Sequence, residues 1–168
     1  TITLYGVVNT CSGTDYHGVT VAGVIAADVS NDDTLVGVAP GVDLVHAAYD
    51  NITNSVGADS TYLAEKWAQA TKFAKDNNHI AQNNSWGYDV QLDTFNAQKS
   101  STGLNNNQLA SYYYNGSYGS TAATSFGEYI TALDNFQSHG VVVVALSNDT
   151  DLTEADISAA LPELYPQL

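Results

Sequence analysis

The sequence predicts an α/β protein in which a doubly wound parallel sheet carries helices on both faces. Short runs of apolar, β-branched residues alternate along the chain with longer segments whose apolar residues recur at helical spacing. The connections between successive runs are long enough to hold a helix, and that order produces parallel strands. The last run, residues 141–145, is wholly apolar, which is typical of a strand buried in a parallel sheet.

The first half of the chain is expected to contribute two strands, two helices and a turn. The clearest element is an amphipathic helix at residues 60–77, for which Ser60 is the expected N-cap. One face of this helix collects the apolar side chains Leu63, Trp67, Ala70, Phe73 and Ala74. The other predicted elements are a strand at residues 2–8, a helix at 17–28, a turn at 34–41 and a strand at 42–48.

The second half is expected to hold two more strands and two more helices around a polar excursion. Residues 88–123 are rich in Asn, Ser and Tyr, so we interpret them as a long surface insertion with room for short strands. Tyr112, Tyr113 and Tyr114 within it either bind a glycan or a partner, or form a tyrosine-rich β-ribbon packed on the sheet. The other predicted elements are strands at 79–84 and 141–145, a helix at 125–138 and a short helix at 150–160 before a Pro-containing tail.

Composition excludes several classes of protein. The chain has 168 residues, which we interpret as a single domain spanning 1–168, and a net charge of 4 − 18 = −14. All four basic residues are Lys, so no cationic face is available for nucleic acid or for an anionic membrane surface. No apolar run is long enough to insert into a membrane. The acid excess and the start at Thr1 without any Met favour a processed or partial polypeptide from a secreted or cell-surface protein.

Four segments, in this order, resemble motifs of the subtilisin-like serine peptidases, the subtilase family. Residues 17–23 (His-Gly-Val-Thr-Val-Ala-Gly) resemble its H-G-T-H-V-A-G block, and residues 37–41 (Gly-Val-Ala-Pro-Gly) resemble its G-V-A-P-x-A stretch. Residues 84–87 (Asn-Ser-Trp-Gly) correspond to its N-x-S-x-G segment, and residues 140–149 to the strand that ends in A-G-N-[DE]. The resemblance runs from about residue 5 to the end. The Asn-rich segment and residues 161–166 are similar to autotransporter-type bacterial members.

The resemblance implies a role for each of these motifs. His17 would be the general base of a serine nucleophile, and Asn148 would donate a hydrogen bond to the oxyanion. Ser85, Trp86 and Gly87 would form the backbone strand that pairs with an extended peptide or protein substrate. The fold implied is the parallel α/β sheet already predicted, here as a partial catalytic domain.

The acidic member of the triad departs from the family pattern. The family's Asp follows the first strand in a V-I-D-[ST]-G pattern, and Asn9 stands at that position here. Asn would favour the wrong imidazole tautomer of His17. Only eight positions separate the two residues, where the family has a longer segment. Asp15 is the nearest substitute carboxylate, although its place before a helix also suits an N-terminal cap.

The serine nucleophile of the family has no counterpart among the 168 residues of this sequence. The family's G-T-S-x-A block comes well after the strand that leads to Asn148, and the similar-looking residues 119–123 have the wrong order and come before that strand. The chain is therefore expected to act with the remaining C-terminal part of a peptidase, which would supply the serine. The alternative is a catalytically inactive extracellular structural or binding module.

No metal site is predicted, because none of the four His residues has metal-ligand spacing. Asp28, Asp32 and Asp33 offer the hard oxygen ligands that calcium takes, but their spacing matches no EF-hand loop. We interpret them as a solvated acidic loop, with calcium as the alternative. Cys11, the single cysteine, precludes an internal disulfide, and its place on the short loop before His17 argues against a Cys–His nucleophile pair.

Overall fold

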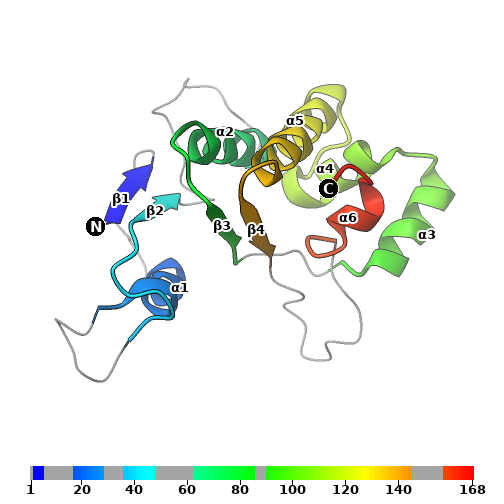
Figure 1. Ribbon diagram of the computed structural model, residues 1–168. Coiled ribbons are helices and arrows are strands. Elements are labelled where there is room, and N and C mark those ends of the chain that lie inside the picture. The colour runs from blue at the N-terminus through cyan, green and yellow to red at the C-terminus, as the bar shows by residue number, and fades with distance from the viewer. Residues whose placement is uncertain (1, 6–16, 29–35, 48–62, 86–89, 145–156) are drawn as a thin grey trace. The chain divides into compact units, whose positions relative to one another are not determined.

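The computed structural model describes residues 2–5, 17–28, 36–47, 63–85, 90–144 and 157–168, and it divides the chain into two compact units. Unit 1 comprises Thr1–Ser60 and unit 2 comprises Thr61–Leu168. Each unit contains a two-stranded parallel sheet, and the elements are labelled in Figure 1. The α/β class and the parallel pairing predicted from the sequence are therefore confirmed.

Unit 1 is a β-α-β arrangement. The strand β1 (Ile2–Tyr5) pairs in parallel with β2 (Leu44–Ala47), so that Ile2 lies opposite Leu44 and Tyr5 opposite Ala47. The helix α1 (His17–Ala26) comes between them in the sequence, as expected of a parallel crossover.

The segment that follows α1 returns to the end of that helix and caps it. The N–H groups of Gly37, Val38 and Ala39 donate to the carbonyl oxygens of Ala27, Val24 and Ile25 at 2.9, 2.9 and 2.8 Å. A helix leaves its last carbonyls without partners, and the bonds to Val24 and Ile25 satisfy two of them, while the bond to Ala27 holds the residue just after the helix. The turn then reverses at Gly41, whose φ of 83° lies in the left-handed region that favours glycine.

Unit 2 is built around two helices packed against each other, α2 (Leu63–Asp76) and α5 (Ser120–Gln137) (Figure 1). The helix α4 (Asn106–Asn115) packs on this pair, and α3 (Leu92–Thr102) and the short α6 (Leu161–Leu164) lie on the far side of it, near α4. The predicted register of α5 is confirmed, because Ile130, Leu133 and Phe136 are all buried. The buried face of α2 is rotated slightly from the predicted one. Trp67 is buried as expected, but the most buried residues around it are Ala64, Ala68 and Thr71.

The excursion at residues 88–123 is helical in its described part, so the expectation of short strands is wrong there, although most of the first helix, α3, is exposed. Gly103 and Gly116 end α3 and α4 in the left-handed conformation, with φ of 71° and 68°. Asn105 begins α4 with a capping box, because its side chain accepts from the N–H of Gln108 and its own N–H donates to the Gln108 side chain. Local capping interactions thus mark where helices begin and end in a segment whose polar composition suggested none.

The sheet of unit 2 pairs β3 (Ala81–Asn84) in parallel with β4 (Val141–Val144). Val142 and Val144 are half-buried on one face, whereas Val141 and Val143 remain 61% and 51% exposed on the other. The prediction of a strand buried on both faces is thus wrong for this strand as described. Within unit 2 the described helices α2 and α5 lie against one face of the pair.

Candidate active site

The two strands of unit 2 bring two of the sequence motifs to one edge of the sheet. Asn84, the last residue of β3, lies opposite Val144, the last residue of β4. Because the strands are parallel and in register, the chain leaves both of them at the same end. Ser85 follows β3 directly, and the segment that leads to Asn148 follows β4. Residues 145–156 lie outside the described part of the chain, so the position of Asn148 stays a prediction.

A hydrogen bond from a neighbouring side chain holds Ser85 at the point where the chain leaves β3. The Asn83 side-chain amide donates to the Ser85 hydroxyl oxygen at 2.6 Å, on the exposed side of β3. Asn84 turns the other way and is 6% exposed. Trp86 and Gly87, the other residues predicted to pair with substrate, lie outside the described residues.

The side chain of Asn84 reaches a buried chain of polar groups that joins β3 to both large helices. Its Nδ2 donates to the Tyr129 hydroxyl on α5 at 3.2 Å, and its Oδ1 accepts from Gln82 Nε2 at 3.1 Å. Gln82 Nε2 also lies 3.1 Å from the Thr71 hydroxyl on α2, to which it donates. Burial raises the pKa of Tyr129 well above its ordinary value, with a smaller contribution from Tyr114. The hydroxyl is therefore a neutral hydrogen-bonding group.

In unit 1, His17 is the first residue of α1, at the helix start where the sequence predicts the general base. Gly37 lies so close to the end of α1 that a Cβ atom there would be 2.5 Å from the backbone N of Ala26. Two of the four motifs, residues 17–23 and 37–41, are thus parts of one local structure. The second supports the helix that the first begins.

The remaining predicted site residues of unit 1 are not described. Asn9, Cys11 and Asp15 all fall within residues 6–16, so the identity of the acidic partner stays a prediction. Asp32 and Asp33 also lie outside the described residues, whereas Asp28 is exposed. Within the described ranges no group of three or more His, Cys, Asp or Glu side chains is arranged to hold a metal ion. None of the helices in those ranges combines the length and apolar character needed to cross a membrane.

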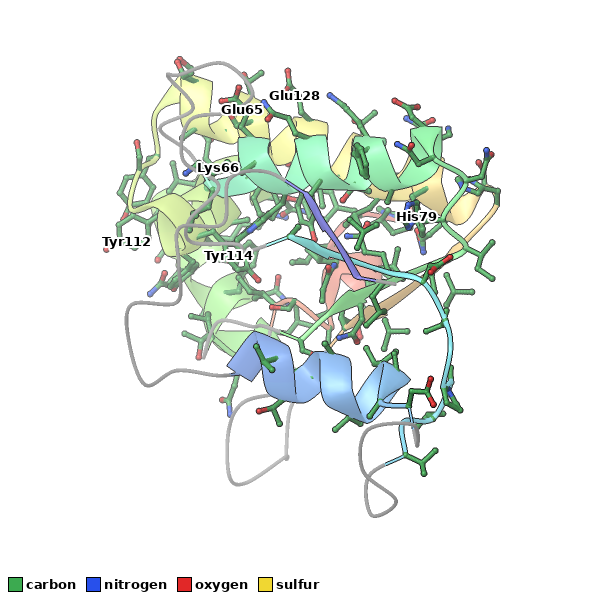
Figure 2. The ribbon with its side chains drawn as sticks, turned by 90° about the vertical axis from the view of Figure 1, so that its left-hand side faces the viewer. Glu65, Lys66, His79, Tyr112, Tyr114 and Glu128 are labelled. Atoms are coloured by element: carbon green, nitrogen blue, oxygen red, sulfur yellow. The ribbon has the colours of Figure 1, made fainter. Side chains whose placement is uncertain are left out.

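The three consecutive tyrosines have three different environments, because they lie on helix α4 and not on a β-ribbon. Tyr114 is buried, and its hydroxyl lies 2.7 Å from that of Ser158. Tyr113 is half-buried and donates a hydrogen bond to Gln98. Tyr112 points outward at the end of α4, as Figure 2 shows, and stacks on Tyr118 with ring centroids 4.2 Å apart. Desolvation raises the pKa of Tyr118, and its hydrogen bond with Tyr112 raises this pKa further. The β-ribbon interpretation is therefore wrong.

Sequence reasoning missed the buried polar groups behind β3. The alternation of burial along β3 places Gln82 and Asn84 on the side that faces the helices, where apolar residues are usual. Two amides at i and i+2 in a predicted strand are a local signal for such a network. Their partner Tyr129, 45 residues further along the chain, could not be assigned without the tertiary structure.

The parallel β-α units, with sequence motifs at their strand and helix ends, define an α/β protein. Comparison with known families identifies which one: residues 8–167 match the model of the Subtilase family. Because the match covers nearly all of the chain, the protein belongs to the subtilase family. Membership of this peptidase family implies a peptide or protein substrate. Searches of curated proteins and of solved structures found no match.

Proposed function

We propose that this chain is the part of a subtilisin-like serine endopeptidase that supplies the general base and the oxyanion donor. His17 would take the proton from a serine located outside these 168 residues and return it to the leaving amine. Asn148 would donate its amide N–H to the oxyanion, an interaction worth about 10²–10³ in rate in acyl transfer. Ser85, Trp86 and Gly87 would hold the substrate as an added strand.

The family match over residues 8–167 is the observation that carries this proposal. The in-register ends of β3 and β4 support it, because a substrate strand next to Ser85 would start from the same sheet edge as the segment containing Asn148. The start of α1 at His17 also supports the assignment of the base. We further propose an extracytoplasmic location, for which the support is the acid-rich, Lys-poor composition.

Fluorophosphonate labelling of the native protein that contains this sequence tests the proposal. We expect a labelled serine in the band that contains the chain, or in a chain that co-purifies with it. His17→Ala should abolish labelling, because the serine would lose its base. Asn148→Ala should fold normally and retain a reactive serine while turning over peptides more slowly. No labelling after prolonged exposure would overturn the proposal.

The second candidate function is a catalytically inactive subtilase-like binding module, and Asn9 is the observation that favours it. The Asn9→Asp variant separates the two candidates. If residue 9 orients His17, a carboxylate there should raise turnover, because the corresponding Asp-to-Asn change costs about 10⁴ in kcat in another triad peptidase. Unchanged turnover would instead favour the catalytically inactive binding module.

A further inference from the structure

The face of β3 that packs on the helices carries polar side chains where packing alone would favour apolar ones. Gln82 and Asn84 lie on this face, next to the fully buried Thr71 and Tyr129. On the neighbouring strand β4, by contrast, the half-buried side chains are the apolar Val142 and Val144. Burying amides is unfavourable unless their hydrogen bonds are made, so their presence requires a reason other than packing.

The hydrogen bonds of these amides are directional and span both helices. Gln82 bonds Thr71 on α2, Asn84 bonds Tyr129 on α5, and the two amides bond each other. An apolar contact would tolerate sliding of the strand, whereas a buried amide placed 3.2 Å from a fixed phenol does not. This hydrogen bond therefore fixes the last residue of β3 in two ways: the rotation of the strand about its own axis, and its position along that axis.

The phenol itself is well fixed. Tyr129 is 1% exposed, its ring contacts those of Trp67 and Phe126, and the centroids lie 5.4 and 6.0 Å away. The pair α2–α5 that surrounds it is the main packing contact of unit 2. The network therefore transmits the position of the helix pair to Asn84, and the next residue is Ser85.

We propose that Tyr129 is a positioning residue for the substrate strand, and that it acts through Asn84 to fix where the chain leaves β3 at Ser85. Only the peptide-binding readout of this inference rests on the proposed function. The placement of Ser85 by Tyr129 can be measured whether or not the protein cleaves peptides.

Tyr129→Phe tests the proposal, because it keeps the ring and removes only the hydroxyl. Tyr165→Phe is the matched control: Tyr165 is also buried in unit 2, but its hydroxyl donates at 2.9 Å to Asn107 on α4 and not to β3. We expect amide exchange at Asn84 and Ser85 to become about tenfold faster in Tyr129→Phe, corresponding to the loss of one buried hydrogen bond. The same amides should be unchanged in Tyr165→Phe.

A double variant separates positioning from stability. Asn84→Leu combined with Tyr129→Phe replaces both partners by apolar groups, which should restore much of the unfolding stability lost in the single variant. If Tyr129 positions the strand, exchange at Ser85 should remain fast in the double variant despite the recovered stability. Recovery of slow exchange together with stability would overturn the proposal, as would equal effects of Tyr129→Phe and Tyr165→Phe.

The functional readout uses the complete peptidase and chromogenic peptides of increasing length. Tyr129→Phe should raise KM for long peptides more than for short ones and leave kcat nearly unchanged, because long peptides depend most on strand pairing. Altered exchange at Ser85 in a protein that neither binds nor cleaves peptides would contradict the proposed function but not the positioning role. Altered peptide affinity without altered exchange would contradict the positioning role.

Discussion

The backbone N–H of Gly37 donates to the carbonyl oxygen of Ala27 at 2.9 Å, so the segment after α1 is tied to the end of that helix. The closeness of the two backbones explains why residue 37 has no side chain. A Cβ at this position would lie 2.5 Å from the N atom of Ala26 and 2.6 Å from that of Ala27. Both neighbours are backbone, so neither can move aside without disturbing the helix.

The Gly37→Ala variant should therefore destabilise unit 1 by about 1–3 kcal/mol, through strain or loss of the capping bonds. Gly23→Ala is the matched control, because a Cβ at Gly23 in α1 would meet nothing within 4 Å. That variant should be neutral, or stabilising by up to about 1 kcal/mol through helix propensity. Amide exchange in α1 and urea unfolding followed by circular dichroism would measure both. Equal stability of the two variants would contradict the steric argument.

Gly140, between α5 and β4, is predicted to be equally intolerant of a side chain. A Cβ there would lie 2.6 Å from Cε1 of Phe136, whose ring is fully buried and cannot swing away. We expect Gly140→Ala to cost about 1–3 kcal/mol in thermal or urea unfolding. Trimming the ring in a Phe136→Leu background should make the added cost of Gly140→Ala smaller. Strict additivity of the two changes would indicate that the contact is not the cause.

The capping box of α4 provides a third prediction. Asn105→Ala should lower the unfolding free energy by about 1 kcal/mol, because the N–H of Gln108 loses its acceptor. Asn105→Asp or Asn105→Ser should retain most of the stability. Gln91→Ala is the control at the start of α3, where the side chain makes no capping hydrogen bond. A cost at residue 91 as large as that at residue 105 would argue against capping as the mechanism.

Buried tyrosines make the stability of unit 2 sensitive to alkali. Burial raises the pKa of both Tyr129 and Tyr165 well above the ordinary value of about 10. Below that pH both states of the protein keep these protons, so the contribution is fully present. Above it the unfolded chain releases them while the folded chain retains them. Stability should therefore fall as pH rises, by up to about 1.4 kcal/mol per pH unit for each tyrosine.

Urea unfolding from about pH 8 to about pH 11 would measure this dependence, since the window spans the ordinary tyrosine pKa. Tyr129→Phe and Tyr165→Phe should each flatten the slope, and together they should remove most of it. A slope unchanged in the double variant would assign the alkaline sensitivity to other groups.

Several elements could be predicted from the sequence because their signals are local. The helical spacing of Ile130, Leu133 and Phe136 predicted α5, and the apolar run after Gly140 predicted β4. The four motifs predicted the family, which the family model confirms. The helices α3 and α4 were missed because their sequences are polar: α3 buries only Phe95, and α4 places the buried Leu109, Ala110 and Tyr114 among Asn, Gln and Ser residues. Their capping residues, Gly103, Asn105 and Gly116, are nevertheless of the types that commonly begin or end helices.

The sequence by itself determined the class of fold, the family and the segments in which the candidate site residues lie, since these depend on patterns within a few residues. Only the tertiary structure decided that Tyr129 bonds Asn84 and that the two amides of β3 face a helix pair. The physical reason is that these contacts join positions far apart in the chain. Which polar groups meet in a core depends on how helices and strands pack, and no local pattern of residues encodes that pairing.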